Sequence, residues 1–81
     1  MINQEELLLK ISQAVAEGDE AESVELVKEA LAGGMDPLHV LNEGASKGMD
    51  IVSEQYNNGE AFLPELVLAG DSMSAVISLI F

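Results

Sequence analysis

The chain has 81 residues, which is enough for one domain with a single small core. It contains no cysteine, so disulfides, thiolate nucleophiles and thiolate metal sites are excluded. Fifteen acidic residues against three lysines give a formal net charge of −12, which repels nucleic acid and anionic membrane surfaces as partners. There is no basic N-terminal region followed by an apolar run, and no apolar segment approaches about 18 residues. We therefore expect neither a signal peptide nor a membrane span, and a cytoplasmic protein.

Hydrophobic residues recur at helical spacing along the whole chain. A first helix is predicted over residues 4–17, because Asn3 and Glu6 form a capping pair at its start. The same kind of start signal at Asp19 predicts a second helix over residues 20–32. No segment alternates apolar and polar residues for long, so strands are not expected.

Two prolines open the remaining helices, since proline is favourable at the first helical position. Pro37 begins a helix predicted over residues 37–57, and Pro64 begins one predicted over residues 64–80. The connections are short, so consecutive helices should be antiparallel neighbours. We therefore predict an all-α fold, an antiparallel four-helix bundle that makes the chain a single domain (1–81).

The third and fourth predicted helices each carry an apolar stripe for the core. The stripe of the third consists of Leu38, Leu41, Ala45, Met49, Val52 and Tyr56. That of the fourth consists of Leu66, Val67, Ala69, Met73, Val76, Ile77 and Ile80.

Gly44 and Gly48 interrupt the third helix, and each costs about 1 kcal/mol relative to alanine. Because they are four residues apart, they share one face of the helix. Two readings stay open: close packing of another helix on this face, or close approach of a flat ligand.

Groups for catalysis or metal binding are scarce. His39 is the only histidine, and it lies in the first turn of the third helix without a second histidine or cysteine to share a metal. We expect it to be an exposed surface residue. The sequence has no phosphate-binding loop and no recognisable serine, histidine and aspartate set. The prediction is a protein without catalytic or metal-ligating residues of its own.

The connection before the fourth helix is unusually apolar. Tyr56 ends the third helix, Phe62 and Leu63 occupy the turn, and Val67 is expected to face out from the first turns of the fourth helix. One interpretation is that these side chains plug the end of the bundle. The other is that part of the group covers a hydrophobic cofactor face.

The order and spacing of several motifs resemble the N-terminal helical domain of corrinoid (cobalamin-binding) proteins of methyltransferase systems, and the similar module of cobalamin-dependent methionine synthase. The most specific matching stretch is Gly59-Glu-Ala-Phe-Leu-Pro-Glu-Leu66. Ala16-Glu-Gly-Asp19, Gly34-Met-Asp-Pro-Leu38 and Gly48-Met49 also match, so the resemblance covers nearly the whole chain.

The resemblance implies a four-helix cap that shields the upper, methyl-bearing face of methylcobalamin. The residues at the family's contact positions are Tyr56 and Leu63, and Val67 lies one turn further along. The implied role is that of a non-catalytic methyl carrier. Its partners would be a corrinoid-dependent methyltransferase and a corrinoid:acceptor methyltransferase.

The family's Rossmann-like cobalamin domain, whose Asp-x-His-x-x-Gly motif supplies the lower axial histidine, is absent from this sequence. His39 does not match that motif. We therefore expect cobalamin in the full-length context, and no tight binding of it by this chain alone.

The last residues, Ser78-Leu-Ile-Phe81, form an apolar run without a polar tail, and we interpret this end as a cut in a longer chain. An alternative function follows from the same feature. The chain would be an acidic helical interaction module that forms a homodimer through its apolar C-terminal helix. The two functions are compatible.

Overall fold

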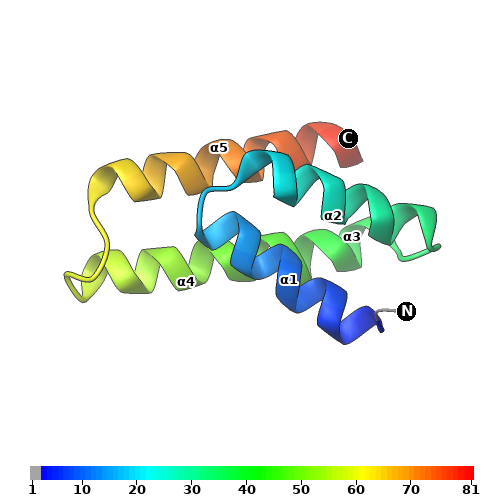
Figure 1. Ribbon diagram of the computed structural model, residues 1–81, viewed down its shortest axis with the longest axis horizontal. Coiled ribbons are helices and arrows are strands. Elements are labelled where there is room, and N and C mark those ends of the chain that lie inside the picture. Colours follow the sequence, from blue (N-terminus) through cyan, green and yellow to red (C-terminus); the bar gives the residue numbers. More distant parts are fainter. Residues whose placement is uncertain (1–2) are drawn as a thin grey trace.

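The computed structural model describes residues 3–81, and every regular element within that range is a helix (Figure 1). The elements are α1 (Gln4–Ala16), α2 (Glu20–Ala32), α3 (Pro37–Val40), the π-helix η1 (Leu41–Ala45), α4 (Ser46–Asn57) and α5 (Leu63–Ile80). α3, η1 and α4 follow one another without a break and form one long rod. The four predicted helices are confirmed, with ends that differ by at most one residue. Consecutive rods run in opposite directions, as predicted (Figure 1).

The predicted start signals of the first two helices form hydrogen bonds. The backbone N–H of Glu6 donates to Oδ1 of Asn3 at 2.8 Å, and that of Glu22 donates to Oδ1 of Asp19 at 3.1 Å. Each bond satisfies one of the N–H groups that have no partner within the helix. Local sequence therefore determines where these two helices begin.

The core is built from branched and small apolar side chains contributed by every rod. The largest completely buried apolar residues are Ile11, Val15, Val27, Val40, Val52 and Val76. The predicted stripes are wrong at Leu38, Tyr56 and Ile77, which are exposed, whereas Val67 is exposed as expected. On α5, apolar residues lie on more than one side of the helix, and only one side reaches the core.

The π-helix η1 was not predicted, and it explains the exposure of Leu38. The backbone N–H of Ser46 donates to the carbonyl of Leu41, five residues earlier. A π-turn inserts one extra residue and so rotates the preceding segment by about 100° relative to a continuous α-helix. As a result Val40, and not Leu38, faces the core.

Gly44 and Gly48 lie directly against α1. A Cβ atom on Gly48 would lie 2.5 Å from the carbonyl oxygen of Ser12 and 2.8 Å from Cβ of Val15. A Cβ on Gly44 would lie 3.2 Å from Cγ2 of Ile11. The face shared by the two glycines is therefore occupied by another helix, which is the close-packing alternative of the two readings.

A buried hydrogen bond joins the same two helices. The hydroxyl of Ser12 lies 2.7 Å from the carbonyl oxygen of Gly44 in η1, and 3.1 Å from the carbonyl oxygen of Leu8 in its own helix. The bond gives the Gly44 carbonyl a partner where regular α-helical bonding is interrupted.

α5 is the one helix among residues 3–81 that is long and apolar enough, by length and composition, to cross a membrane; its 18 residues have a mean hydropathy of 1.5. The expectation that no apolar segment approaches this length is therefore wrong. Length and composition alone do not separate a membrane span from a bundle helix. Ala69, Ser72 and Val76 are buried where α5 packs against the other helices.

We predict that Gly48→Ala destabilises the fold by about 1–3 kcal/mol, because the added methyl group meets backbone and a buried valine. Gly70→Ala is the control, since a Cβ on Gly70 meets nothing within 4 Å and alanine is the better helix former. Urea unfolding at low protein concentration, followed by circular dichroism, measures both changes. Equal stability of the Gly48→Ala and Gly70→Ala variants would contradict the close-packing account.

We predict that Ser12→Ala costs about 1–3 kcal/mol, because it leaves the buried Gly44 carbonyl without its partner. Ser72→Ala is the matched control: Ser72 is also buried, but its hydroxyl donates only to the Leu68 carbonyl of its own helix. Thermal unfolding compares the two variants. If Ser72→Ala costs as much as Ser12→Ala, the bond between helices has no special role.

Candidate functional site

The connection between α4 and α5 is a tight turn held by backbone hydrogen bonds. Gly59 adopts φ +78°, a left-handed conformation that glycine enters without strain. The N–H groups of Glu60 and Ala61 both donate to the carbonyl of Gln55, at 2.8 and 3.2 Å. The turn is therefore compact and tied to the last part of α4.

Ala61 is the residue of this turn that enters the core. Its side chain is buried and joins a small apolar cluster with Val52 of α4 and Ala69 of α5. The interpretation of Phe62 and Leu63 as an end-plug is therefore wrong, because they are 70% and 59% exposed. The small side chain of Ala61 fills the space between α4 and α5 at this junction.

α5 begins immediately after the turn. The backbone N–H of Phe62, at the N-cap, donates to Oε1 of Glu65 at 3.1 Å. Pro64 lies in the first helical turn, where a backbone N–H would have no partner within the helix, so proline costs no hydrogen bond there. This local pairing determines where Leu63 and Val67 lie on the first two turns of α5.

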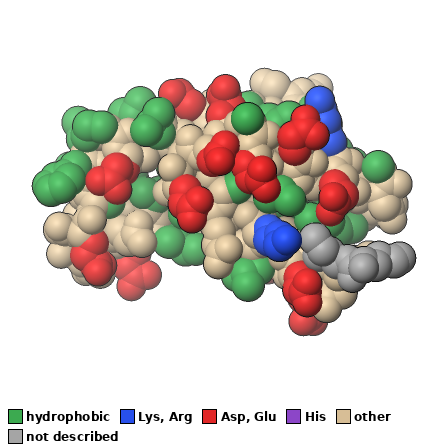
Figure 2. Space-filling view, in the orientation of Figure 1, with side chains coloured by type: hydrophobic (Ala, Val, Ile, Leu, Met, Phe, Trp, Pro, Cys, Tyr) green, Lys and Arg blue, Asp and Glu red, His purple; other side chains and the backbone are tan. Residues whose placement is uncertain are grey.

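The exposed apolar residues at this end are Tyr56, Phe62, Leu63 and Val67, which we call the apolar end. Tyr56 is 43% exposed and Val67 is 55% exposed. Figure 2 shows hydrophobic side chains gathered at the end of the molecule where α4 runs into α5. The three predicted contact residues all lie in this region: Tyr56 precedes the turn, while Leu63 and Val67 share one face of α5.

Phe62 is the residue that the predicted contact set left out, although it is more exposed than the three residues in that set. The position of Phe62 just before a helix could have identified it from the sequence. The residue just before a helix has an extended backbone, here φ −108° and ψ 167°, and does not belong to the helical stripe. An aromatic residue at that position is therefore a candidate for surface contact.

The chemistry that the apolar end can support is limited to contact and exclusion of water, because its side chains include no nucleophile, base or metal ligand. Among residues 3–81, no group of three or more His, Cys, Asp or Glu side chains could hold a metal ion. His39 is exposed on α3, far along the molecule from the α4–α5 turn (Figure 1).

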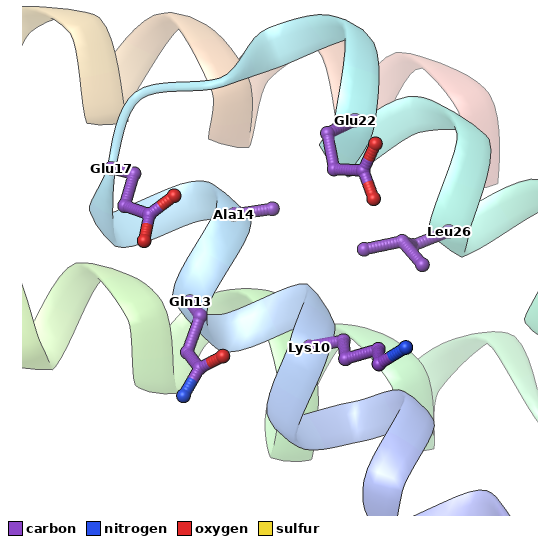
Figure 3. A pocket seen from close by; sticks show the side chains of 6 residues that line it. All are labelled: Lys10, Gln13, Ala14, Glu17, Glu22 and Leu26. Atoms are coloured by element: carbon purple, nitrogen blue, oxygen red, sulfur yellow. The ribbon is translucent and has the colours of Figure 1, made fainter. Parts of the chain in front are cut away.

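Two surface hollows lie elsewhere. One, of about 220 Å³, lies between α1 and α2 and is lined by Lys10, Gln13, Ala14, Glu17, Glu22 and Leu26. Figure 3 shows Gln13 pointing away from Glu22 and Leu26 and Glu17 lying apart from them at the end of α1, so the polar groups do not converge. The other, of about 390 Å³, includes His39 and the ion pair between Lys47 and Glu43, whose Nζ and Oε2 atoms are 3.3 Å apart. Neither hollow combines convergent polar groups with the enclosed apolar walls of a ligand pocket.

Comparison with known proteins gives close relatives over nearly the whole chain. The trimethylamine corrinoid protein of Methanosarcina barkeri is 36% identical over 80 residues, which are 99% of this chain and 37% of that protein. The structure of the Methanosarcina barkeri monomethylamine corrinoid protein superposes with a TM-score of 0.93 at 33% identity, over 96% of this chain and 37% of that one.

The second solved structure is the methanol:cobalamin methyltransferase complex MtaBC from Methanosarcina barkeri. It has a TM-score of 0.87 and 31% identity, and the match covers 96% of this chain and 30% of that one. This chain therefore spans about a third of the length of each of these relatives.

The family described as B12 binding domain matches residues 7–80. The sequence identity, the superposition and the coverage of the chain all indicate the same family. The chain therefore belongs to the B12 binding domain family, as a helical cap domain homologous to the methylamine corrinoid proteins of Methanosarcina.

Proposed function

We propose that this chain is the cap of a corrinoid methyl carrier and that its apolar end covers the upper face of the bound corrinoid. Tyr56, Leu63 and Val67 are the contact residues, and Phe62 lies beside them. The observation that carries the proposal is the exposure of these apolar side chains at the α4–α5 turn of a B12 binding domain. A contiguous exposed apolar patch is typical of a surface that meets a partner or ligand.

The apolar end is suited to covering the face of a flat ring. It is not suited to binding the cobalt at the centre of that ring. The four residues of the apolar end come from two helices and their connecting turn, and the tyrosine hydroxyl is their one polar side-chain group. When bound, a corrinoid supplies a cobalt atom that carries a methyl group. The ligands and the enclosing pocket would come from an α/β domain outside this chain, as the resemblance implies.

The work of the chain's own residues would be to exclude water. Leu63 and Val67, one turn apart, would place their branched side chains against the ring, and water would be displaced from between them. Tyr56 would lay its ring on the same surface while its hydroxyl reaches solvent or a polar partner at the rim. Because the cap is a rigid bundle, transfer of the methyl group would require the whole apolar end to move aside.

The proposed place of the chain in its system follows from the names of its relatives. We propose that it is a non-catalytic, cytoplasmic part of a methyl-transfer system. The methyl group would pass from a small methyl donor to the corrinoid and then to an acceptor. A corrinoid-dependent methyltransferase and a corrinoid:acceptor methyltransferase would catalyse these two transfers. The structure of a methanol:cobalamin methyltransferase complex among its relatives supports this class of partner.

We predict that Tyr56→Ala combined with Leu63→Ala speeds light-driven loss of the methyl group by roughly fivefold, equivalent to about 1 kcal/mol. The host is the monomethylamine corrinoid protein of Methanosarcina barkeri with its matching helical region replaced by this chain. The visible spectrum of the corrinoid reports the rate. Leu9→Ala is the control, because Leu9 is an exposed leucine on α1. A double variant that decays at the rate of this control would exclude the shielding role.

We predict that the 81-residue chain alone binds free cobalamin with a Kd weaker than about 1 mM, because a few apolar contacts supply less than about 4 kcal/mol. Isothermal titration calorimetry measures this directly. Micromolar binding would mean that the chain contains a pocket or a cobalt ligand that this account does not recognise.

A further inference from the structure

α5 has a second apolar face that the bundle does not use. The face, which we call the α5 stripe, consists of Leu63, Val67, Gly70, Ser74, Ile77 and Phe81. Successive members are four and three residues apart in alternation, the spacing that keeps side chains on one seam of a helix. Its four large residues are all exposed, with Ile77 at 40% and Phe81 at 80%.

The α5 stripe is separate from the side of the helix that enters the core. The buried residues of α5 are Ala69, Ser72 and Val76. Ser72, on the core side, is two residues and so about 200° around the helix axis from Gly70, which belongs to the α5 stripe. The two sides therefore face in nearly opposite directions. Helices that are apolar on more than one side are usually covered on more than one side. Within residues 3–81, the large residues of the α5 stripe remain exposed.

The α5 stripe is symmetric about position 72. Leu63 and Phe81 are each nine residues from it, Val67 and Ile77 are each five, and Gly70 and Ser74 are each two. In an antiparallel pair with a twofold axis at position 72, large residues therefore face large residues. The small residues face each other at the centre, where small side chains permit close approach.

Two further features of α5 favour pairing through the α5 stripe. A Cβ on Gly70 would meet nothing within 4 Å, so the centre of the stripe is open to a neighbour. Leu66, Met73 and Ile80, which are partly buried, continue the apolar surface along one flank.

We propose that the occupant of the α5 stripe is a second copy of this chain, with the two α5 helices antiparallel and crossing at position 72. A twofold interface requires a surface that is complementary to itself, and the stripe has that property. The 18 residues of α5 give a seam about 27 Å long. The proposal goes beyond the cap function and does not rest on it.

Charge makes the pairing dependent on salt. The α5 stripe contains no charged residue, but each copy carries a formal charge of −12, and Asp71 lies next to the axis in both copies. Repulsion between like charges opposes the dimer and is screened by salt. The dimer should therefore strengthen as ionic strength rises.

The pairing also has a consequence for the apolar end. Leu63 and Val67 belong both to the α5 stripe and to the proposed corrinoid contact. A copy whose α5 is paired would therefore not be free to cover a corrinoid, and the two states exclude each other.

Sedimentation of the 81-residue chain over about two decades of concentration tests the proposal. We expect a reversible monomer–dimer equilibrium whose dissociation constant falls at least severalfold between about 0.02 and 0.5 M salt. Ile77→Lys should abolish the dimer while circular dichroism confirms that the fold is retained. Leu9→Lys, which makes the same change at an exposed leucine of α1, should leave the dimer in place.

Engineered cysteines test the register, because the natural sequence has none. Gly70→Cys and Ser74→Cys chains, mixed and oxidised, should give mainly the mixed disulfide, since the two positions face each other across the axis. A parallel pair would instead give Ser74→Cys homodimers, and that result would overturn the proposal. A chain that stays monomeric at all concentrations, or binds neutral lipid vesicles through Ile77 instead, would also overturn it.

Discussion

The close contact between α1 and the glycine face of the third rod is the constraint on which the rest of the structure depends. Gly48 leaves no room for a Cβ beneath Ser12 and Val15. Two helices this close fix each other's position with little freedom to slide. The Ser12 hydroxyl adds a directional bond to Gly44 and so determines the register of the crossing. The π-turn η1 lies at the same place and rotates α3 so that Val40 enters the core.

The position of the apolar end follows from this crossing. α4 continues from the glycine face to Tyr56, and the turn at Gly59 returns the chain into α5. Because Ala61 alone fills the junction with Val52 and Ala69, the larger residues beside it remain outside. Because the small Ala61 fills the junction, the large apolar residues around it form an exposed surface at one end of the bundle. That surface is what a cap needs if it is to cover a flat ring.

The sequence predicted the helices well because their ends are local events. Asn3 and Asp19 cap their own helices, and the prolines open the others, so no tertiary contact is needed to find those boundaries. The choice between helix packing and a ligand at Gly44 and Gly48 could not be made from spacing, since both need the same small residues. The π-turn has no local signal in Leu-Asn-Glu-Gly-Ala, and the partner of its Gly44 carbonyl is Ser12, which is distant in the sequence.

The apolar residues of the last helix were harder to interpret for a physical reason. α5 is apolar on more than one side, so periodicity finds a helix but does not say which side faces the core. Ile77 was assigned to the core stripe and is exposed, and Phe62 and Leu63 are exposed where an end-plug was one interpretation. The contact role of Tyr56 and Leu63 came from the family resemblance, and Val67 was added because it lies one turn beyond Leu63. It stays a prediction, now with the side chains found at the surface.

The most direct measurement of the central claim is a crystal structure of this chain joined to a corrinoid-loaded α/β domain of its monomethylamine relative. We expect side-chain atoms of Tyr56, Leu63 and Val67 within about 4 Å of the upper face of the ring. We also expect that no water lies between them. A ring faced by α1 and α2, with the apolar end left in solvent, would contradict the account.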